Sequence, residues 1–315
     1  MKRIQKLAIV VPCFNEEEII AKTIAQLSEI ITDLINKNKI AEDSFLLCVD
    51  DGSRDKTWQI ITQYSDKNQK VKGIKLAHNA GHQSALMAGL FWSKEKSDMA
   101  ISIDADLQDD VSVIEQFIDK FYQGAEIVYG VRSTRKKDTY FKRKTAESFY
   151  KIMQLMGVEI IYNHADYRLT SRKALEALEQ YHESNLFLRG IFPIIGFKSE
   201  KVMYERKERM AGTSKYPLRK MMSFAWDGIT SFSVKPLKLI STVGFVIFLA
   251  SLMAGIWTIY EVLMGRTVHG WASTVLPIYL ISGVQLLSLG IIGEYIGKIY
   301  KETKKRPLYI IEEES

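Results

Sequence analysis

The chain has 315 residues, of which 47% are hydrophobic and 25% charged, and its formal net charge is +6. This composition excludes an intrinsically disordered protein, and the length suffices for one large domain or two smaller parts. Two cysteines, Cys13 and Cys48, are too few and too far apart for a disulfide framework or a zinc motif. We expect both to be buried as small hydrophobic side chains in a reducing compartment.

Strand and helix patterns alternate along the first part of the chain. Short apolar segments predict strands at 7–11, 45–49, 71–76, 99–103 and 126–131. Apolar residues at helical spacing predict helices between them at 17–37, 55–65, 81–93 and 111–122. This alternation predicts an α/β fold with a mostly parallel sheet covered on both faces, in which ligands bind at the carboxyl ends of strands.

A polar motif follows each of the first four predicted strands. The motifs are PCFNEEE at 12–18, DDGSRD at 50–55, AHNAGHQS at 77–84 and DADLQDD at 104–110. Because the carboxyl ends of parallel strands meet at one edge of a sheet, we expect all four motifs to face one cleft. The chain has no Walker motif for ATP phosphates, and no GxGxxG follows the first strand to indicate a dinucleotide.

Asp104 and Asp106 stand two residues apart at the end of the fourth strand, so both side chains point the same way. Crowded carboxylates raise one another's pKa unless a cation neutralises them. The simpler interpretation is a solvated loop that caps the next helix. Hard oxygen ligands at this spacing favour Mg²⁺ or Mn²⁺, coordinated jointly with a substrate diphosphate. Asp109 and Asp110 are expected to begin the helix that follows.

Two segments near the C-terminus carry no charged residue, 22 residues at 239–260 and 23 residues at 271–293. At ~1.5 Å per residue each is long enough to cross a hydrocarbon core of ~30 Å, which predicts two transmembrane helices. Lys and Arg flank the outer ends of both segments but are sparse between them. The positive-inside rule therefore predicts a multi-pass protein of the cell membrane with both termini in the cytoplasm.

A helical stripe precedes the first uncharged segment, formed by Leu218, Met221, Met222, Ala225, Ile229 and Phe232. It predicts an amphipathic helix at the membrane surface, with a helix of the protein core as the alternative. The predicted organisation is a cytoplasmic domain at 1–215, this juxtamembrane helix at 216–235, two transmembrane helices at 236–300 and a cytoplasmic tail at 301–315.

The combination of VVPCFNEEE, VDDGSRD, NAGHQSALMAGL and SIDADLQDD resembles the family 2 glycosyltransferases, which have the Rossmann-like GT-A fold. HADYRLTSRKAL at 164–175 and ERKERMAGTSKYPLRKM at 205–221 resemble the polyprenyl-phosphate glycosyltransferases, the group similar to dolichyl-phosphate mannose synthase. Two C-terminal spans ending in IIGEYIGKIYKETKKRPLYI resemble the bactoprenol glucosyltransferase branch of that group. The resemblance covers nearly the whole chain.

This resemblance implies a role for several groups of residues. The nucleoside of the donor is expected to be bound by Pro12, Phe14, Glu16 and Asp50. Gln108 matches a position beside the metal ligands Asp104 and Asp106. Asp166 matches the acidic residue at which the family places its catalytic base. The phosphates of donor and acceptor are expected to be bound by Arg132, Arg143, Arg206, Arg209 and Lys215.

Each role has a structural alternative. Glu16 also suits the N-terminus of the first helix, and Asp51 suits the cap of the next one. Asp166 also suits an ion pair with Arg168 or Arg172. Since a phosphate monoester is already substantially ionised at neutral pH, Asp166 can orient the acceptor as well as act as a base. No metal-binding spacing links His78, His82, His164 and His182, and all four are expected to be ordinary.

The resemblance implies an inverting glycosyltransferase that moves one sugar from a UDP-sugar to undecaprenyl phosphate at the cytoplasmic membrane face, for modification of cell-envelope glycans. Mg²⁺ or Mn²⁺ is the expected cofactor, and a homo-oligomer is the expected assembly. A processive polysaccharide synthase of the same fold is one alternative, although its QxxRW motif is missing here. A non-catalytic membrane scaffold is the other.

Overall fold

The computed structural model describes most of the chain. The residues that it describes are 3–133, 155–156, 161, 163–183, 187–205, 226, 229–231, 233–264 and 271–315. Most of the predicted juxtamembrane helix at 216–235 lies outside these residues. So do four of the predicted phosphate-binding residues, Arg143, Arg206, Arg209 and Lys215.

One eight-stranded sheet organises the described residues, in the order β7-β5-β6-β4-β1-β2-β3-β8. Its strands are β1 Leu7–Cys13, β2 Phe45–Asp50, β3 Val71–Leu76, β4 Met99–Ser102, β5 Ile127–Arg132, β6 His164–Ser171, β7 Ser199–Tyr204 and β8 Ile311–Glu314. The five predicted strands are thereby confirmed as β1 to β5.

One half of the sheet is parallel, as predicted. In this half β1 pairs with β2 and with β4, and β2 pairs with β3. The intervening helices are confirmed as α1 Ile20–Asn36, α2 Thr57–Lys67, α3 His82–Lys94 and α4 Ile114–Tyr122, the last preceded by a short 3₁₀ turn. The carboxyl ends of β1 to β4 therefore meet at one edge.

The other half of the sheet contains one antiparallel strand, yet all described strands except β6 and β8 run in one direction, so the sheet is mostly parallel as expected. β6 lies between β4 and β5 and runs antiparallel to both, while β7 continues parallel to β5. β6 reads HADYRLTS, and because charged and polar residues interrupt its apolar pattern, no strand is predicted there. Since β6 is antiparallel, its amino end lies beside the carboxyl end of β4.

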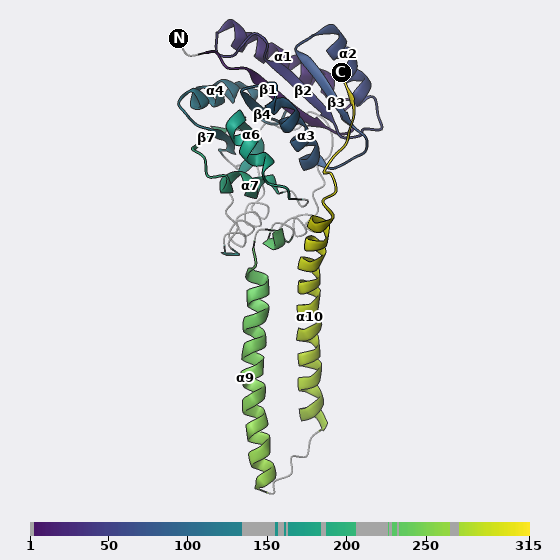
Figure 1. The fold of residues 1–315 in the computed structure, drawn as a ribbon, viewed down its shortest axis with the longest axis vertical. Helices are drawn as coiled ribbons and strands as arrows, with labels where there is room; N and C mark the ends of the chain where they lie inside the picture. The colour runs from purple at the N-terminus through teal and green to yellow at the C-terminus, as the bar shows by residue number, and fades with distance from the viewer. Residues whose placement is uncertain are drawn as a thin grey trace.

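Alternation along each strand divides the core between two helical layers. Leu7, Ile9 and Val11 of β1 pack on one face, which α1, α2 and α4 cover. Ala8 and Val10 pack on the opposite face, which α3 covers together with α6 Arg172–Glu179 and α7 Leu188–Ile194. Cys13 and Cys48 are buried and free, as predicted. Figure 1 shows α1 and α2 together on one side of the strands.

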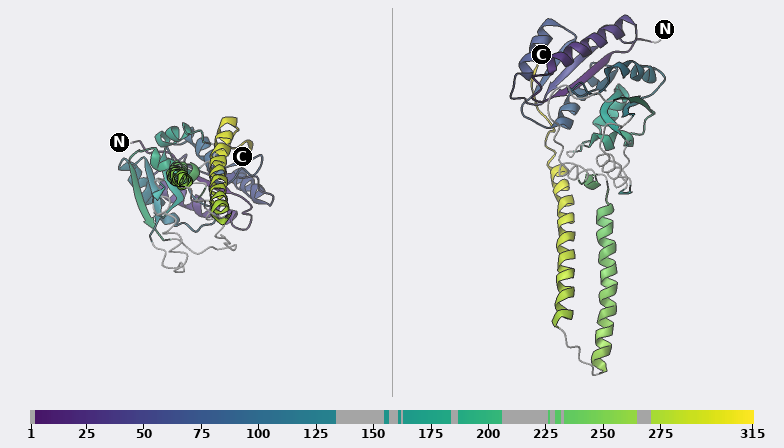
Figure 2. Two further views of the ribbon diagram at one scale, coloured as in Figure 1. Left: turned by 90° about the horizontal axis from the view of Figure 1, so that it is seen from below. Right: turned by 180° about the vertical axis from the view of Figure 1, so that it is seen from behind.

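Two long helices extend side by side away from the sheet, α9 Lys235–Leu263 and α10 Trp271–Lys304 (Figures 1 and 2). They contain the uncharged segments 239–260 and 271–293. In the described parts of the chain, however, no helix meets both the length and the apolar character needed to cross a membrane. At the sheet end of the pair, the Tyr295 hydroxyl donates to the Ser233 carbonyl at 2.6 Å.

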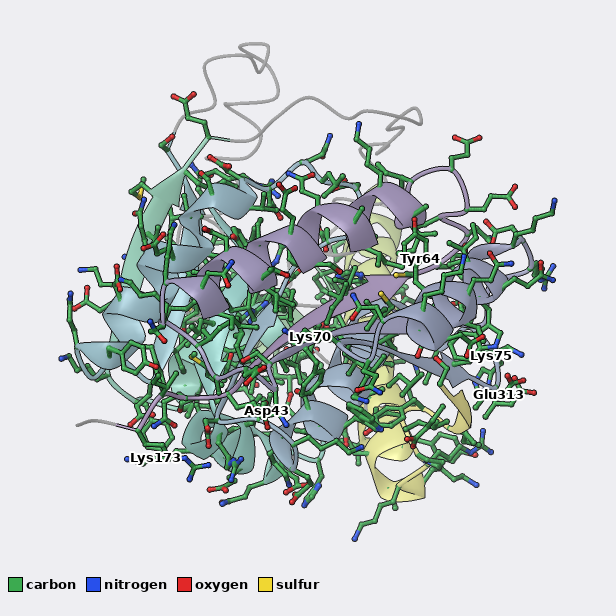
Figure 3. The ribbon with its side chains drawn as sticks, turned by 90° about the horizontal axis from the view of Figure 1, so that it is seen from above. Asp43, Tyr64, Lys70, Lys75, Lys173 and Glu313 are labelled. Atoms are coloured by element: carbon green, nitrogen blue, oxygen red, sulfur yellow. The ribbon has the colours of Figure 1, made fainter. Side chains whose placement is uncertain are left out.

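The chain returns from α10 to the sheet. The segment predicted as a tail forms β8, which pairs antiparallel with β3 and makes the edge of the sheet. Backbone hydrogen bonds between Gly73 and Ser315 run in both directions, and Lys75 pairs with Glu312 at 2.8 Å and Glu313 at 3.4 Å. Figure 3 shows Lys75 and Glu313 next to each other at this edge.

Candidate active site

A cavity of about 370 Å³ opens where the loops after β1, β2 and β3 meet. Its lining residues are Phe14, Asn15, Gly52, Arg54, Ala77, His78 and Asn79. Gly52 has a left-handed φ of 67°, and a Cβ there would lie 2.7 Å from the backbone of His78. The β2 and β3 loops therefore approach closely because this residue is glycine. Phe14 is 43% exposed and offers its ring to the cavity.

The other predicted nucleoside residues border this cavity without lining it. Asp50 ends β2 and is fully buried; its Oδ2 accepts from the Ser53 N–H at 3.2 Å, whereas its Oδ1 has no hydrogen-bond partner. Burial raises the pKa of Asp50 above its ordinary value. Pro12 is buried within β1, and the Glu16 backbone N–H donates to the Thr57 hydroxyl at 2.8 Å.

Asp51 does not cap the helix that directly follows it. Its carboxylate accepts from the N–H groups of Ala80 and Gly81, at 2.7 Å and 3.0 Å, and so fixes the β3 loop just before α3. Asp55 takes the position before α2, where it accepts from the Thr57 N–H at 3.0 Å. The expected cap by Asp51 is wrong because its carboxylate already accepts from the backbone N–H groups of the β3 loop. Gly52 allows that loop to approach closely.

The turn after β4 carries the predicted metal ligands. The Asp106 Oδ1 accepts from the Gln108 N–H at 3.2 Å, and the Leu107 between them has a φ of 53°. That left-handed backbone is rare for a residue with a branched side chain, and such conformations concentrate at functional sites. The Thr23 hydroxyl of α1 anchors the turn by donating to the Ala105 carbonyl at 2.7 Å.

Negative charge gathers at this turn. Burial, together with the charges of Asp166, Asp109 and Asp106, raises the pKa of Asp104 to about 6, although the charge of His82 acts in the opposite direction. The Asp104 side chain is still 32% exposed, so a ligand can reach it. A cation would offset this repulsion and lower the pKa of Asp104 toward its ordinary value.

These groups fit a divalent cation. Asp104 and Asp106 supply hard oxygen donors, and the Oε1 of Gln108 is buried without a hydrogen-bond partner. Within the described residues, no three His, Cys, Asp or Glu side chains are grouped closely enough to hold an ion by themselves. A cation at this turn therefore needs further oxygen ligands, which a bound diphosphate can supply.

Asp166 lies on the amino-end side of β6, beside the end of β4. The Ser102 hydroxyl donates to its carbonyl at 2.5 Å. Its carboxylate pairs with Arg168 at 2.6 Å and with Arg189 of α7 at 3.1 Å. Burial alone would raise the pKa of Asp166, but the charges of Arg189 and Arg168 outweigh it and hold the pKa well below its ordinary value.

The expected alternative for Asp166 is thus confirmed for Arg168 but not for Arg172. Arg172 begins α6 at the far end of β6 and pairs with Asp98 at 3.4 Å. Arg168 is fully buried, and its guanidinium lies 4.2 Å from the ring centre of Phe192. Asp166 therefore compensates a cation that has no access to water.

His82 and Arg189 are site residues that sequence reasoning missed. The His82 Nε2 at the start of α3 lies 3.6 Å from Asp104 and 3.9 Å from Asp166, so it stands between the two carboxylates. Its position directly after the β3 motif was the available signal. Arg189 had none, because only the pairing of β6 beside β4 brings α7 to the cleft.

Asp109, Tyr204 and Arg132 form a second buried group. The Tyr204 hydroxyl donates to Asp109 at 2.5 Å, and the Arg132 guanidinium lies 3.8 Å from the same carboxylate. The expectation that Asp109 begins the next helix is therefore wrong, since Tyr204 binds its side chain. It is confirmed for Asp110, which accepts from the Ser112 N–H at 3.2 Å.

Taken in order, the site has three parts. The cavity of the β1, β2 and β3 loops suits a nucleoside, the carboxylates of the β4 turn suit a cation, and the arginines around β6 suit an anion. His82 stands where the acidic and basic parts meet. An enzyme that transfers a group from a nucleoside diphosphate to an anionic acceptor needs these three parts side by side.

Comparison with known families agrees with this arrangement. A family model described as glycosyl transferase family 2 matches residues 8–179. A second, described as the GtrB C-terminal hairpin, matches residues 235–299. The chain belongs to glycosyl transferase family 2 and is a glycosyltransferase homologous to bactoprenol glucosyl transferases.

Individual relatives cover almost the whole chain. An uncharacterized glycosyltransferase of Bacillus subtilis, YkoT, is 57% identical over 97% of this chain and 91% of its own. A prophage bactoprenol glucosyl transferase homolog of Escherichia coli is 39% identical over 97% of this chain and 98% of its own.

One similar solved structure is that of glucosyl-3-phosphoglycerate synthase from Mycobacterium tuberculosis, in complex with Mn²⁺, UDP-glucose and glycerol 3-phosphate. Its sequence is 16% identical, and the match has a TM-score of 0.45. The match covers 72% of this chain and 78% of that chain.

Proposed function

We propose that the chain transfers a single sugar from a UDP-sugar to the phosphate of undecaprenyl phosphate, with inversion at the anomeric carbon. The observation that carries the proposal is the junction at His82, whose Nε2 lies 3.6 Å from Asp104 of the acidic turn and 3.9 Å from Asp166, the carboxylate that Arg168 and Arg189 contact. The names of the bactoprenol glucosyl transferase relatives support the lipid acceptor, and glucose is the first sugar to test.

The donor would lie along the edge formed by β1 to β4. The cavity takes the nucleoside, with Phe14 against the base. The unpartnered Oδ1 of Asp50 is available to a nucleoside N–H or hydroxyl after a small opening of the loops. Glu16 and Pro12 shape the same edge. The diphosphate then reaches the turn after β4.

Asp104, Asp106 and Gln108 would hold a Mg²⁺ or Mn²⁺ ion together with that diphosphate. When bound, the ion supplies neutralisation of the charge that develops on the departing UDP. His82 occupies the border between this turn and the acceptor side, and so separates the two charged ligands.

The reaction is a displacement at the anomeric carbon. An acceptor phosphate oxygen forms the new bond to that carbon, the bond to the UDP oxygen breaks, and its electron pair leaves with UDP. The acceptor needs no proton removed when it is dianionic, as a monoester with a second pKa near ~6 largely is at neutral pH. The low pKa of Asp166 suits a residue that orients cations better than one that accepts a proton.

The C-terminal part would hold the cleft at the cytoplasmic face of the bacterial membrane. The family match to the GtrB hairpin and the two uncharged segments support a pair of crossing helices. The pairing of β8 with β3 supports the orientation, because it keeps the end of α10 on the same side as the sheet. The lipid-linked sugar would serve as a donor for cell-envelope glycans.

A panel of radiolabelled UDP-sugars tests the proposal on full-length protein in vesicles containing undecaprenyl phosphate. Label that partitions into organic solvent, from one UDP-sugar above the others, is the expected result. Label in an insoluble polymer would instead indicate a processive synthase. The absence of any transfer, with Mg²⁺ and Mn²⁺ each supplied, would indicate a non-catalytic scaffold.

A further inference from the structure

Arg189 is fixed at the junction of three elements. Its Nη2 and Nε donate to the two oxygens of Asp166 at 3.1 Å and 3.4 Å, which ties α7 to β6. The preceding residue, Leu188, donates its N–H to the Gln83 side chain of α3 at 3.0 Å. The guanidinium is therefore held in one place before any ligand arrives, and such preorganisation lowers the cost of binding.

Two guanidiniums share the single negative charge of Asp166. Arg168 is fully buried, and Phe192 packs against it, so it cannot turn toward a ligand. One carboxylate contacts both guanidiniums, so each arginine shares this partner with the other. Because the Arg189 side chain is 32% exposed and that of Arg168 is fully buried, Arg189 is the one of the two that a ligand can reach.

Arg132 adds a second cation on the same side. It is held by Tyr204 and Asp109, and its charge and that of Arg189 repel each other. Two neighbouring arginines that repel each other gain from a ligand that carries two negative charges. A phosphate monoester carries about −1.5 to −2 at neutral pH and binds planar guanidinium groups in a bidentate way.

We propose that Arg189 binds the phosphate of the acceptor, and that Asp166 is the positioning residue that aims its guanidinium. This inference rests on the proposed function and names the group that recognises its acceptor. Asp166 acts on the acceptor indirectly, by holding Arg189 in place, and does not take a proton from the acceptor. The two residues should then act as one unit.

The test uses full-length protein in vesicles, with the KM for undecaprenyl phosphate and for the UDP-sugar measured separately. Arg189→Gln should raise the acceptor KM by about ten-fold or more, because it removes a charge-assisted bidentate contact. Arg189→Lys should recover part of this loss, since it keeps the charge but not the planar fork. UDP binding by calorimetry should stay within experimental error of wild type. Arg172→Gln, at the opposite end of β6, is the matched control.

A double-mutant cycle then separates positioning from base catalysis. Asp166→Asn should also raise the acceptor KM, and the double variant should lose little more than Arg189→Gln alone. Additive losses, or an unchanged acceptor KM in Arg189→Gln, would overturn the assignment while wild-type transfer keeps the proposed function intact. Lost UDP binding in Arg189→Gln would make the residue structural. A wild-type protein that transfers no sugar would overturn the proposed function itself.

Discussion

At the scale of single residues, the protonation of the polar groups around β6 depends on the charges buried beside them. His164 begins β6 next to the charged group of Asp166 and Arg168. Its Nδ1 donates to the Ile161 carbonyl at 2.9 Å, while its Nε2 is buried without a partner. Burial and, after it, the charges of Arg168 and Arg189 lower the pKa of His164 to about 3. The imidazole is therefore neutral in the folded protein.

This neutral histidine should make stability depend on pH. Near pH 5 the unfolded chain protonates His164 and the folded chain does not, so the free energy of unfolding falls as pH drops from about 6.5 toward 3. Between pH 7 and pH 5 the loss from this residue is about 2 kcal/mol. Urea unfolding of wild type and His164→Gln at both pH values measures it. An equal loss in both proteins would show that other groups carry the dependence.

A second prediction concerns the acidic turn after β4. Asp106→Asn keeps an oxygen that can accept from the Gln108 N–H, so the turn should keep its shape, but it removes a charged ligand of the proposed cation. Transfer and metal-dependent UDP binding should fall by at least about ten-fold, with an unchanged melting temperature. Asp110→Asn is the matched control, because asparagine caps a helix as well as aspartate. Full activity in Asp106→Asn at ordinary metal concentration would contradict the cation site.

At the scale of elements, α3 lies against the parallel half of the sheet through a glycine. A Cβ on Gly89 would lie 2.4 Å from a methyl of Val10 and 2.7 Å from a methyl of Val49. Both valines are β-branched residues in buried strands, so neither has an easy alternative rotamer. The helix can approach the sheet this closely only with glycine at this position.

Gly89→Ala should destabilise the protein although alanine favours helices. The gain in helix propensity is about 1 kcal/mol, and the cost of overpacking a buried contact is about 1 to 3 kcal/mol, so we expect a net loss of up to about 2 kcal/mol. Denaturant unfolding measures the change. Gly283→Ala in α10, where nothing lies within 4 Å of the added methyl, is the matched control and should cause no loss. A stabilised Gly89→Ala protein would mean that α3 packs less tightly than described.

The elements also show what the sequence can predict. The strands β1 to β5 and helices α1 to α4 follow from apolar spacing because each buries a regular face. β6 was not predicted because Arg168 and Asp166 interrupt that apolar pattern. Their charges are compensated by a buried ion pair that forms only in the folded protein. The acidic turn was predictable from four neighbouring strand ends. Arg189 was not, because its partner Asp166 is 23 residues away and the β6 insertion joins them.

At the scale of the whole molecule, β8 joins the end of the helical pair to the far edge of the sheet. Trp58 donates to Glu313 at 2.9 Å and Trp92 donates to Glu314 at 3.0 Å, so the last residues contact both α2 and α3. The chain thus leaves the sheet domain before α9 and returns to it after α10. Such a double connection restricts how the cleft can tilt relative to the helices.

Deleting residues 311–315 should therefore affect transfer to a lipid in vesicles but not transfer to a soluble acceptor. The surface ion pairs lost with β8 contribute about 0 to 1 kcal/mol each, so the domain should remain folded and bind UDP. Transfer to undecaprenyl phosphate in vesicles should fall several-fold, because the cleft is no longer held near its acceptor. Transfer to a short prenyl phosphate in solution should not change. The variant Glu312→Gln with Glu313→Gln keeps the strand and is the control. Equal losses on both acceptors would exclude a positioning role for β8.

One sugar should pass from a nucleotide to one lipid phosphate. Mass spectrometry of the lipid, after full-length protein has acted on undecaprenyl phosphate with the preferred UDP-sugar and metal, measures this directly. The predicted product is undecaprenyl phosphate heavier by one sugar residue, formed in step with an equal amount of UDP. A ladder of heavier lipids, or UDP released without any change in the lipid, would contradict the account.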